Sequence, residues 1–237
     1  FDMIKFCKSK GIPVVLSTNA TILSEDYSRR LIEAGLDYLI FAFDGASRET
    51  YEKYRKGASF DKVRDNIYTF LRIKKEMNSG IFCAVQMVAL KDNRGEAQAL
   101  IRMWRREGLA VRIKKDEILN IGSAIPGAAF DRTPMRHPCL HLWRGPMYIT
   151  YDGTAYPCCY IFPDEPIGNA LEHDIQELWN SEKMMNLRNA HLRGDLRDYK
   201  GCQRCQAARP LLPVALGSFL MNAHTVWKTI PFFERMA

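Results

Sequence analysis

Four cysteines near the carboxyl end of the chain have the types and spacing of a metal site. Cys139, Cys158, Cys202 and Cys205 follow the pattern C-x18-C-x43-C-x2-C. The first two flank residues 147–157, which we expect to form a hairpin, and the last two form a tight turn. Four thiolates that converge from a hairpin and a turn make a tetrahedral sulfur cage. Such a cage suits either Zn²⁺ or an iron–sulfur cluster, and the spacing leaves both open.

The remaining composition is that of an ordinary globular protein. The chain has 237 residues, 47% of them hydrophobic and 26% charged, and seven cysteines are too few for a disulfide scaffold of this length. Cys7 and Cys83 lie in apolar runs, so we expect them to pack as small hydrophobic residues. We expect no signal peptide, and no apolar run in residues 1–237 approaches the ~20 residues that cross a bilayer. We expect a cytoplasmic protein with no membrane partner, where clustered cysteines favour metal over disulfides.

The charge pattern does not point to nucleic acid. The formal net charge is +7, from 34 basic and 27 acidic residues, and the basic residues are scattered along the chain. Solvated helix faces explain most of them, and no basic stripe alternates with aromatic residues. Nucleic-acid binding is therefore not expected.

A regular alternation of strands and helices positions the residues before the cysteines. Strands are predicted over 13–18, 38–43, 81–90 and 110–113, and helices over 24–34, 60–77 and 96–107, with Ser24 and Ser47 as helix caps. Alternation with short turns predicts parallel strands joined by right-handed crossovers. The fold class is α/β, and four such units are half a barrel or an open sheet.

The alternation stops after Lys115. Gly and Pro residues between 121 and 138 are typical of a linker. We expect a partial (βα) barrel over 1–120, a linker over 121–135, a cysteine-bearing domain over 136–209 with helices at 174–180 and 182–192, and a tail over 210–237 that packs on the body.

Taken together, these features resemble radical S-adenosylmethionine (SAM) enzymes with a carboxyl-terminal SPASM or twitch domain. The matching stretches are Cys139, Asp152-Gly153-Thr154-Ala155-Tyr156-Pro157-Cys158, Gly168-Asn169, Leu178-Trp179-Asn180-Ser181 and Cys202-Gln203-Arg204-Cys205, with Leu16-Ser17-Thr18-Asn19-Ala20, Phe43-Asp44-Gly45-Ala46-Ser47 and Tyr54-Arg55-Lys56-Gly57 in the barrel part. The resemblance covers nearly all of residues 1–209. Its cysteine pattern is specific, whereas the barrel motifs alone are weak.

The resemblance implies a ligand set for one auxiliary 4Fe–4S cluster: Cys139, Cys158, Cys202 and Cys205. The family pattern Gly-x4-Cys fits Gly153 and Cys158, so Cys159 is interpreted as a packing or neighbouring thiol. No cysteine follows Cys205, which favours the single-cluster version. Four protein ligands leave no open coordination position, which favours electron transfer.

The resemblance also implies an activity. A 5′-deoxyadenosyl radical made from SAM at a second 4Fe–4S cluster would abstract a substrate hydrogen, with a flavodoxin- or ferredoxin-type protein as reductant. Substrates in the family range from peptides to sugars and aminocyclitols.

Three residues of the barrel part are candidates for binding SAM. Arg55 resembles the arginine that pairs with the SAM carboxylate, with a solvated helix arginine as the alternative. Asn19 and Asp44, like Thr18, follow strands at their carboxyl ends, where α/β folds place ligands; turn and cap chemistry is the alternative. Gln86 and Met87 are further candidates for the same cavity. Ala42 stands where the family pattern often has serine, which removes one hydroxyl contact.

One family motif is missing. No C-x-x-x-C-x-x-C, the motif that holds the SAM-cleaving cluster, occurs in residues 1–237. The chain opens at Phe1 in the middle of a helical pattern, and we interpret it as truncated before that point. We expect it to be unable to cleave SAM alone. Two alternatives stay open: a zinc-binding interaction module on an α/β scaffold, and a binding-only relic that keeps the auxiliary cluster.

Four aromatic side chains near the cysteines receive structural interpretations. His137 and His141 flank Cys139, and we interpret them as surface residues or as neighbours of the ligands, because four cysteines complete a cage. Trp143 and Trp179 are predicted to be core residues of the cysteine-bearing domain.

Overall fold

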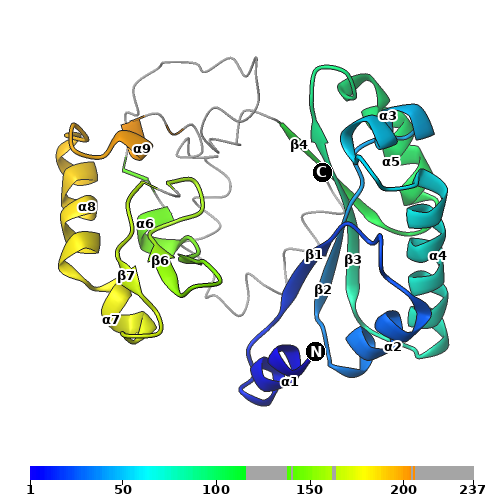
Figure 1. Cartoon of the computed structure of the whole chain (residues 1–237), viewed down its shortest axis with the longest axis horizontal. Coiled ribbons are helices and arrows are strands. Elements are labelled where there is room, and N and C mark those ends of the chain that lie inside the picture. Colours follow the sequence, from blue (N-terminus) through cyan, green and yellow to red (C-terminus); the bar gives the residue numbers. More distant parts are fainter. Residues whose placement is uncertain (116–137, 140, 162–163, 204, 206–237) are drawn as a thin grey trace. The chain divides into compact units, whose positions relative to one another are not determined.

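The computed structural model describes residues 1–115, 138–139, 141–161, 164–203 and 205 (Figure 1). The chain divides into two compact units, whose described parts are residues 1–115 and residues 138–205 with the gaps just given. The predicted linker over 121–135, the predicted tail over 210–237 and His137 lie outside the described residues. Each unit has a hydrophobic core of its own.

A four-stranded sheet forms the first unit. Its strands are β1 (Val15–Thr18), β2 (Tyr38–Ala42), β3 (Phe82–Ala89) and β4 (Ala110–Lys115), in the order β1-β2-β3-β4. All neighbours are parallel. The α/β class and the parallel arrangement expected from the sequence are thus confirmed. The last strand continues two residues beyond the predicted end at Ile113.

One helix precedes the first strand and the others connect the strands (Figure 1). The helices are α1 (Asp2–Ser9), α2 (Glu25–Glu33), α3 (Arg48–Tyr54), α4 (Phe60–Glu76), a 3₁₀ turn η1 (Arg94–Glu96) and α5 (Ala97–Arg105). The side chains of Ser24, Ser47 and Ser59 each accept a backbone N–H of the first turn that follows. These caps satisfy donors that have no partner inside the helix, which is why the helices begin there.

The core of this unit follows from the alternation of side chains along β2. Leu39 and Phe41 belong to the main core cluster, while Tyr38 and Ile40 belong to a second cluster with Ala84 and Ala110. Strand side chains alternate between the two faces of a sheet, so β2 is apolar on both faces. The core aromatics Phe43 and Trp104 pack edge to face at 5.2 Å between ring centroids.

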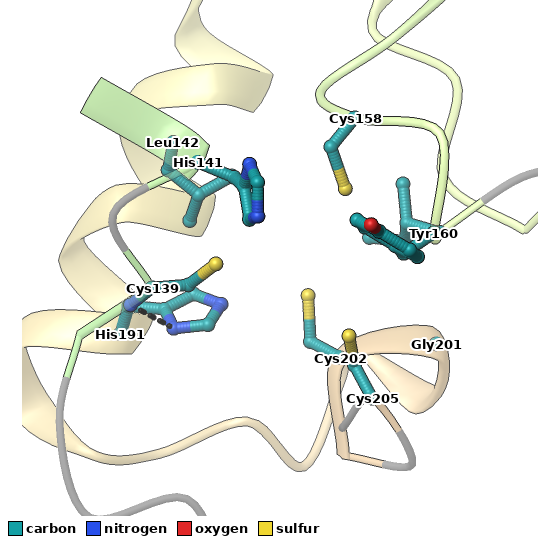
Figure 2. A pocket seen from close by; sticks show the side chains of 10 residues that line it. Cys139, His141, Leu142, Cys158, Tyr160, His191, Gly201, Cys202 and Cys205 are labelled. Atoms are coloured by element: carbon teal, nitrogen blue, oxygen red, sulfur yellow. Dashed lines mark hydrogen bonds between the residues drawn. The ribbon is translucent and has the colours of Figure 1, made fainter. Parts of the chain in front are cut away.

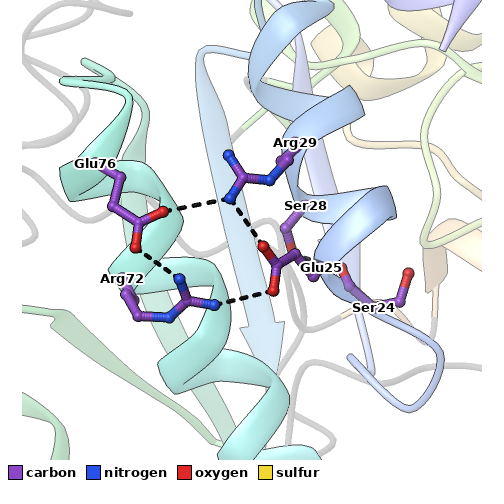
Figure 3. A network of polar contacts seen from close by, with 6 residues as sticks. All are labelled: Ser24, Glu25, Ser28, Arg29, Arg72 and Glu76. Carbon is purple, nitrogen blue, oxygen red and sulfur yellow. Dashed lines mark hydrogen bonds and ion pairs between the residues drawn. The ribbon is translucent and has the colours of Figure 1, made fainter.

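Ion pairs join α2 and α4 on the surface of the first unit (Figure 3). Arg72 Nη1 donates to Glu76 and Arg72 Nη2 to Glu25, at 2.6 and 3.0 Å, and Arg29 Nη2 donates to Glu25 at 2.8 Å. Their side chains are 40% to 51% exposed. Exposed pairs add little to stability, so the apolar contacts beneath them hold the two helices together.

The second unit is built from short elements. Its antiparallel sheet has the order β5-β6-β7 and comprises β5 (Tyr148–Ile149), β6 (Thr154–Tyr156) and β7 (Gly168–Asn169). Its helices are α6 (His141–Arg144), α7 (Ile175–Trp179), α8 (Glu182–Arg193) and α9 (Lys200–Gln203). The predicted hairpin and two helices are confirmed; α6 and α9, four residues each, were not predicted.

The hairpin and the helix ends have local causes. Gly153 has φ +84° in the β5–β6 turn, a conformation that favours glycine, and its N–H donates to the Thr150 carbonyl at 3.0 Å. Asp174 and Glu177 form a reciprocal capping box at the start of α7. Gly194 ends α8 in the left-handed conformation.

The burial of several predicted packing residues differs from expectation. The core prediction for Trp143 was wrong: its side chain is exposed, because α6 is a single turn that buries its neighbour Leu142. Trp179 is half-buried against the core. Cys83 is buried in the first unit, as predicted, whereas Cys7 is only half-buried. Among the described residues, no helix is both long and apolar enough to span a membrane.

Candidate metal centre

The four cysteines singled out by their spacing line one pocket of the second unit. Cys139 precedes α6, Cys158 follows β6, Cys202 lies in α9 and Cys205 follows it. Figure 2 shows the four sulfur atoms directed toward a common space. Three parts of the chain that are far apart in sequence thus bring four thiols together.

Backbone contacts fix the loops that carry these thiols. The Leu142 N–H donates to the Cys139 carbonyl at 3.2 Å, and the Cys205 N–H donates to the Cys202 carbonyl at 3.1 Å. Gly201 packs against Ile161, and a Cβ at this glycine would lie 2.8 Å from the Ile161 side chain. A larger residue at 201 would therefore displace the turn that holds Cys202.

Burial sets the charge state of the thiols. Desolvation raises the pKa of Cys139 to about 11, and it raises the pKa values of Cys158 and Cys202 as well. The nearby thiols add to these shifts because adjacent thiolates repel one another. Buried thiols of this kind stay neutral unless a cation compensates their charge. A bound metal, which takes thiolates as ligands, supplies that compensation, so the donor set fits a metal group.

The donor set is one that both zinc and iron–sulfur clusters use. A zinc site places four sulfurs about 2.3 Å from one point, and cubane clusters take four cysteine thiolates. Among the described residues, no group of three or more His, Cys, Asp or Glu side chains that could hold a single metal ion is found.

Two histidines and a tyrosine complete the pocket. His141, Tyr160 and His191 line it beside the cysteines (Figure 2). His141 was interpreted as a surface residue or a neighbour of the ligands, and it is half-buried in the wall of the cavity. Burial lowers the pKa of His141 and of His191, which favours neutral imidazoles.

Sequence reasoning missed His191 and Arg188. Both lie on the buried face of α8, whose spacing Met184, Leu187, Arg188, His191 repeats every three to four residues. Arg188 Nε donates to the Leu142 carbonyl at 2.8 Å, and its guanidinium lies 4.8 Å from the Trp179 ring centroid. Arg188 thereby ties α8 to α6. The sequence feature that could have identified them is the presence of polar residues on an otherwise apolar helix face.

The two neighbouring cysteines differ in exposure. Cys158 is 7% exposed and lines the pocket, whereas Cys159 is exposed and is not among the lining residues. This placement agrees with the choice of Cys158, made from the spacing to Gly153. The ligand set itself remains a prediction.

A second group of candidates lies at the carboxyl ends of the parallel strands. Asp44 follows β2 and is 8% exposed. Its Oδ2 accepts from Arg55 Nε at 2.8 Å and from Nη2 at 2.5 Å, while its Oδ1 accepts the Val88 N–H at 2.8 Å. Arg55 and Asp44, two of the three SAM-binding candidates, are therefore partners of each other.

The third candidate, Asn19, takes part in a local turn. Its side chain is exposed, and its Oδ1 accepts from the backbone and the hydroxyl of Thr21 at 3.1 and 2.8 Å. Thr18 likewise accepts the Ala20 N–H at 3.0 Å. These contacts are the turn chemistry that the sequence left open as the alternative. Gln86 is half-buried and Met87 is buried in the core.

Two further residues, missed by sequence reasoning, hold the Asp44 loop. Asn93 is fully buried, and its Nδ2 donates to the carbonyls of Asp44 and Val88 at 3.0 and 2.9 Å. The carboxylate of Glu96 accepts the Ala46 N–H and the hydroxyls of Ser47 and Thr50, the last two at 2.6 and 2.7 Å. Both lie between β3 and α5, Asn93 just before the 3₁₀ turn η1 and Glu96 at its end.

Comparison with protein families finds one matching family for each of the two units. Residues 1–103 match the radical SAM superfamily. Residues 139–206 match SPASM, an iron–sulfur cluster-binding domain, and this span includes all four pocket cysteines. The two matches leave out residues 104–138 and 207–237.

Curated relatives match parts of the chain. Fe-coproporphyrin III synthase of Methanosarcina barkeri is 37% identical over 59 residues, which are 24% of this chain and 14% of that protein. The tungsten-containing aldehyde ferredoxin oxidoreductase cofactor-modifying protein of Pyrococcus furiosus is 20% identical over 228 aligned residues, covering 77% of this chain and 63% of that protein. The chain thus spans less than two thirds of either relative.

A solved structure shares the fold at low identity. anSMEcpe with bound AdoMet and the Kp18Cys peptide has a TM-score of 0.54 and 14% identity, and the match covers 82% of this chain and 65% of that one. The parallel α/β unit, the four-cysteine pocket and the two family matches agree with one another. The chain is a member of the radical SAM superfamily that carries a SPASM iron–sulfur cluster-binding domain.

Proposed function

We propose that the chain belongs to a radical SAM enzyme whose SPASM unit holds one auxiliary 4Fe–4S cluster on Cys139, Cys158, Cys202 and Cys205. The observation that carries the proposal is the convergence of four cysteine side chains on one pocket, three of them 7% exposed. Cubane clusters take four cysteine thiolates, which matches this donor set. When bound, the cluster would supply one-electron chemistry.

The protein's own part at this site is to hold and shield the group. Leu142 and Ile161 form apolar walls of the pocket, and the carbonyl of Leu142 is held by Arg188. Apolar walls limit access of water, and cluster potentials depend on that exposure. Because all four positions would be filled by protein, the site suits electron transfer better than substrate ligation.

We further propose that the carboxyl edge of the parallel sheet binds SAM. Asp44 uses its carboxylate to orient the guanidinium of Arg55, and Asn93 holds the Asp44 backbone. The remaining N–H groups of an oriented arginine can pair with a carboxylate such as that of SAM. Asn19 follows β1, whose neighbour is β2, and would contribute its carboxamide at the same edge.

The reaction would be hydrogen abstraction from a substrate by a 5′-deoxyadenosyl radical, for which SAM and a reducing cluster supply the chemistry. A peptide substrate has support from the fold neighbour anSMEcpe, whose structure holds AdoMet and a peptide. Sugars and aminocyclitols are the other substrate class that the sequence resemblance implies. A flavodoxin- or ferredoxin-type protein is the proposed electron donor.

The cluster is tested by anaerobic reconstitution followed by iron and sulfide analysis. We expect about four iron and four sulfide per chain. Cys158→Ala should lose the cluster, whereas Cys159→Ala, the adjacent exposed thiol, should retain it. Stoichiometric zinc without iron would favour the zinc-binding module. Equal iron loss in both variants would contradict the ligand set.

SAM binding is tested separately by calorimetry. Arg55→Ala and Arg55→Lys should both weaken binding, since lysine cannot reproduce the planar fork. The exposed Arg48→Ala, at the start of α3, is the matched control.

Because residues 1–237 contain no C-x-x-x-C-x-x-C, we expect these residues with SAM and dithionite to yield no 5′-deoxyadenosine. Formation of 5′-deoxyadenosine by residues 1–237 would contradict that expectation.

A further inference from the structure

His191 occupies an unusual position behind the cysteine pocket. It lies on the buried face of α8 and is only 5% exposed. Its Nδ1 accepts the backbone N–H of Cys139 at 3.4 Å. This contact joins α8 to the segment that carries the first cysteine, as the dashed line in Figure 2 shows.

That contact fixes the tautomer of the ring. A neutral imidazole has one protonated and one unprotonated nitrogen, and the nitrogen that accepts a hydrogen bond is the unprotonated one. Since Nδ1 accepts from Cys139, the proton of His191 is on Nε2. The hydrogen bond from the Cys139 amide to Nδ1 therefore makes Nε2 a hydrogen-bond donor.

The donor at Nε2 has no partner among the described residues. Within the part of the chain that the structure describes, His191 Nε2 is buried and makes no hydrogen bond. Buried donors are normally satisfied, so an orphan of this kind calls for a ligand. His191 lines the cavity, and in Figure 2 its second nitrogen faces the space between the sulfur atoms.

The chemistry of the pocket limits what can accept this hydrogen bond. Its walls contain the apolar Leu142 and Ile161, the rings of His141 and Tyr160, and four cysteine sulfur atoms. A cysteine thiolate or an inorganic sulfide of a bound cluster is an acceptor of the right kind and place. Hydrogen bonds to cluster sulfurs are among the factors that set reduction potentials.

We propose that His191 Nε2–H donates to a sulfur atom of the auxiliary cluster and thereby raises its reduction potential. The inference rests on the proposed cluster site. A donor stabilises the more negative, reduced cluster more than the oxidised one, so it favours electron uptake. His191 would thus tune the cluster as an electron acceptor while its other nitrogen holds the Cys139 backbone.

Two substitutions separate these roles. His191→Asn keeps an oxygen acceptor near the Nδ1 position for the Cys139 amide but has no group that reaches the Nε2 position. His191→Gln is longer and can place an amide N–H there. His173→Asn is the control, because His173 is an exposed histidine of the same unit and is not among the pocket residues.

The experiment measures the cluster in the reconstituted full chain. In an anaerobic redox titration followed by EPR, His191→Asn should shift the one-electron reduction equilibrium about tenfold toward the oxidised cluster. This shift corresponds to a reduction potential about 59 mV lower than that of the wild type. His191→Gln should recover most of this shift, and His173→Asn should show none. In protein labelled with ¹⁵N-histidine, pulsed EPR of the reduced cluster should detect a weak nitrogen coupling that His191→Asn abolishes.

The outcomes are distinguishable. A loaded cluster whose potential is the same in wild type and His191→Asn overturns the inference and leaves the cluster site intact. If His191→Asn fails to retain the cluster, the ¹⁵N coupling of the wild type decides, and its absence overturns the inference. A wild type without iron contradicts the proposed cluster site itself and removes the basis of this proposal.

Discussion

The two units bury their interiors in different ways. Among the described residues, the main core cluster of the parallel unit has 21 buried residues, while that of the cysteine unit has 11, and three of these are Cys139, Cys158 and Cys202. The strands of the parallel unit have four to eight residues, and those of the cysteine unit two or three. A small unit with short strands has little apolar area to offset its loss of conformational entropy.

Because of this contrast, cysteine residues have different roles in the two units. Cys83 is a packing residue of β3, and burial raises its pKa to about 12, so it stays a neutral thiol. Three of the four pocket cysteines, Cys139, Cys158 and Cys202, are buried too, but they line a cavity. The parallel unit is held by its hydrocarbon core, and we expect the cysteine unit to depend on its metal group.

The largest effect should come from removing the metal group. Cys202→Ala should destabilise the cysteine unit by more than about 4 kcal/mol, since loss of a metal is among the most damaging changes known. Amide exchange measured by mass spectrometry should rise throughout α8 and stay unchanged in β2 and β3. Equal loss of protection in both units would show that they do not fold independently.

A core substitution in the other unit should have the complementary effect. Phe41 is fully buried in β2 and packs on Phe70 with ring centroids 5.6 Å apart. Phe41→Ala should cost about 3–5 kcal/mol, the usual cost of such a cavity. Denaturant unfolding should show this loss with the iron content unchanged. The exposed Phe6→Ala is the control; loss of iron in Phe41→Ala would argue against separate cores.

An intermediate, pH-dependent effect is expected at Glu96. Burial alone would raise the pKa of this carboxyl, but the hydrogen bonds from Ser47, Thr50 and two backbone amides outweigh it, and the pKa is lowered from 4.5. A lowered pKa stabilises the fold above about pH 4.5 and loses that contribution as the pH falls through the folded value. Thermal melts should show this acid destabilisation in wild type and a flatter profile in Glu96→Gln.

Partial loss of the same contacts sharpens that test. Ser47→Ala removes one hydrogen bond to the Glu96 carboxylate and also the cap of α3. Its acid profile should lie between those of the wild type and Glu96→Gln. A profile identical to that of the wild type would show that Thr50 and the backbone amides suffice to lower the pKa of Glu96.

The smallest effect is expected at the surface network between α2 and α4. Arg72 and its partners Glu25 and Glu76 are about half exposed, so water competes with their ion pairs (Figure 3). Arg72→Ala should change the melting temperature little, and the difference should vanish in about 1 M salt, where the Debye length is about 3 Å. A large, salt-independent loss would mean that Arg72 packs as well as pairs.

The sequence by itself determined the local structure. The apolar run at 38–43, the capping serines Ser24 and Ser47 and the alternation of strands and helices predicted the parallel sheet, because these features depend on neighbours within a few residues. The spacing of the cysteines likewise predicted which thiols to consider. Trp143 was predicted wrongly because a four-residue helix has too few positions to show a buried face.

Only the tertiary structure decided which side chains meet. That Arg55 pairs with Asp44, that Asn93 holds the Asp44 backbone, and that His191 faces the cysteine pocket all depend on contacts between residues 11 to 52 positions apart. Such contacts form when helices and loops pack, and no local pattern encodes them. The spacing of the cysteines in the sequence indicated the four thiols. The folded chain placed His191 beside them, where the backbone N–H of Cys139 orients its ring.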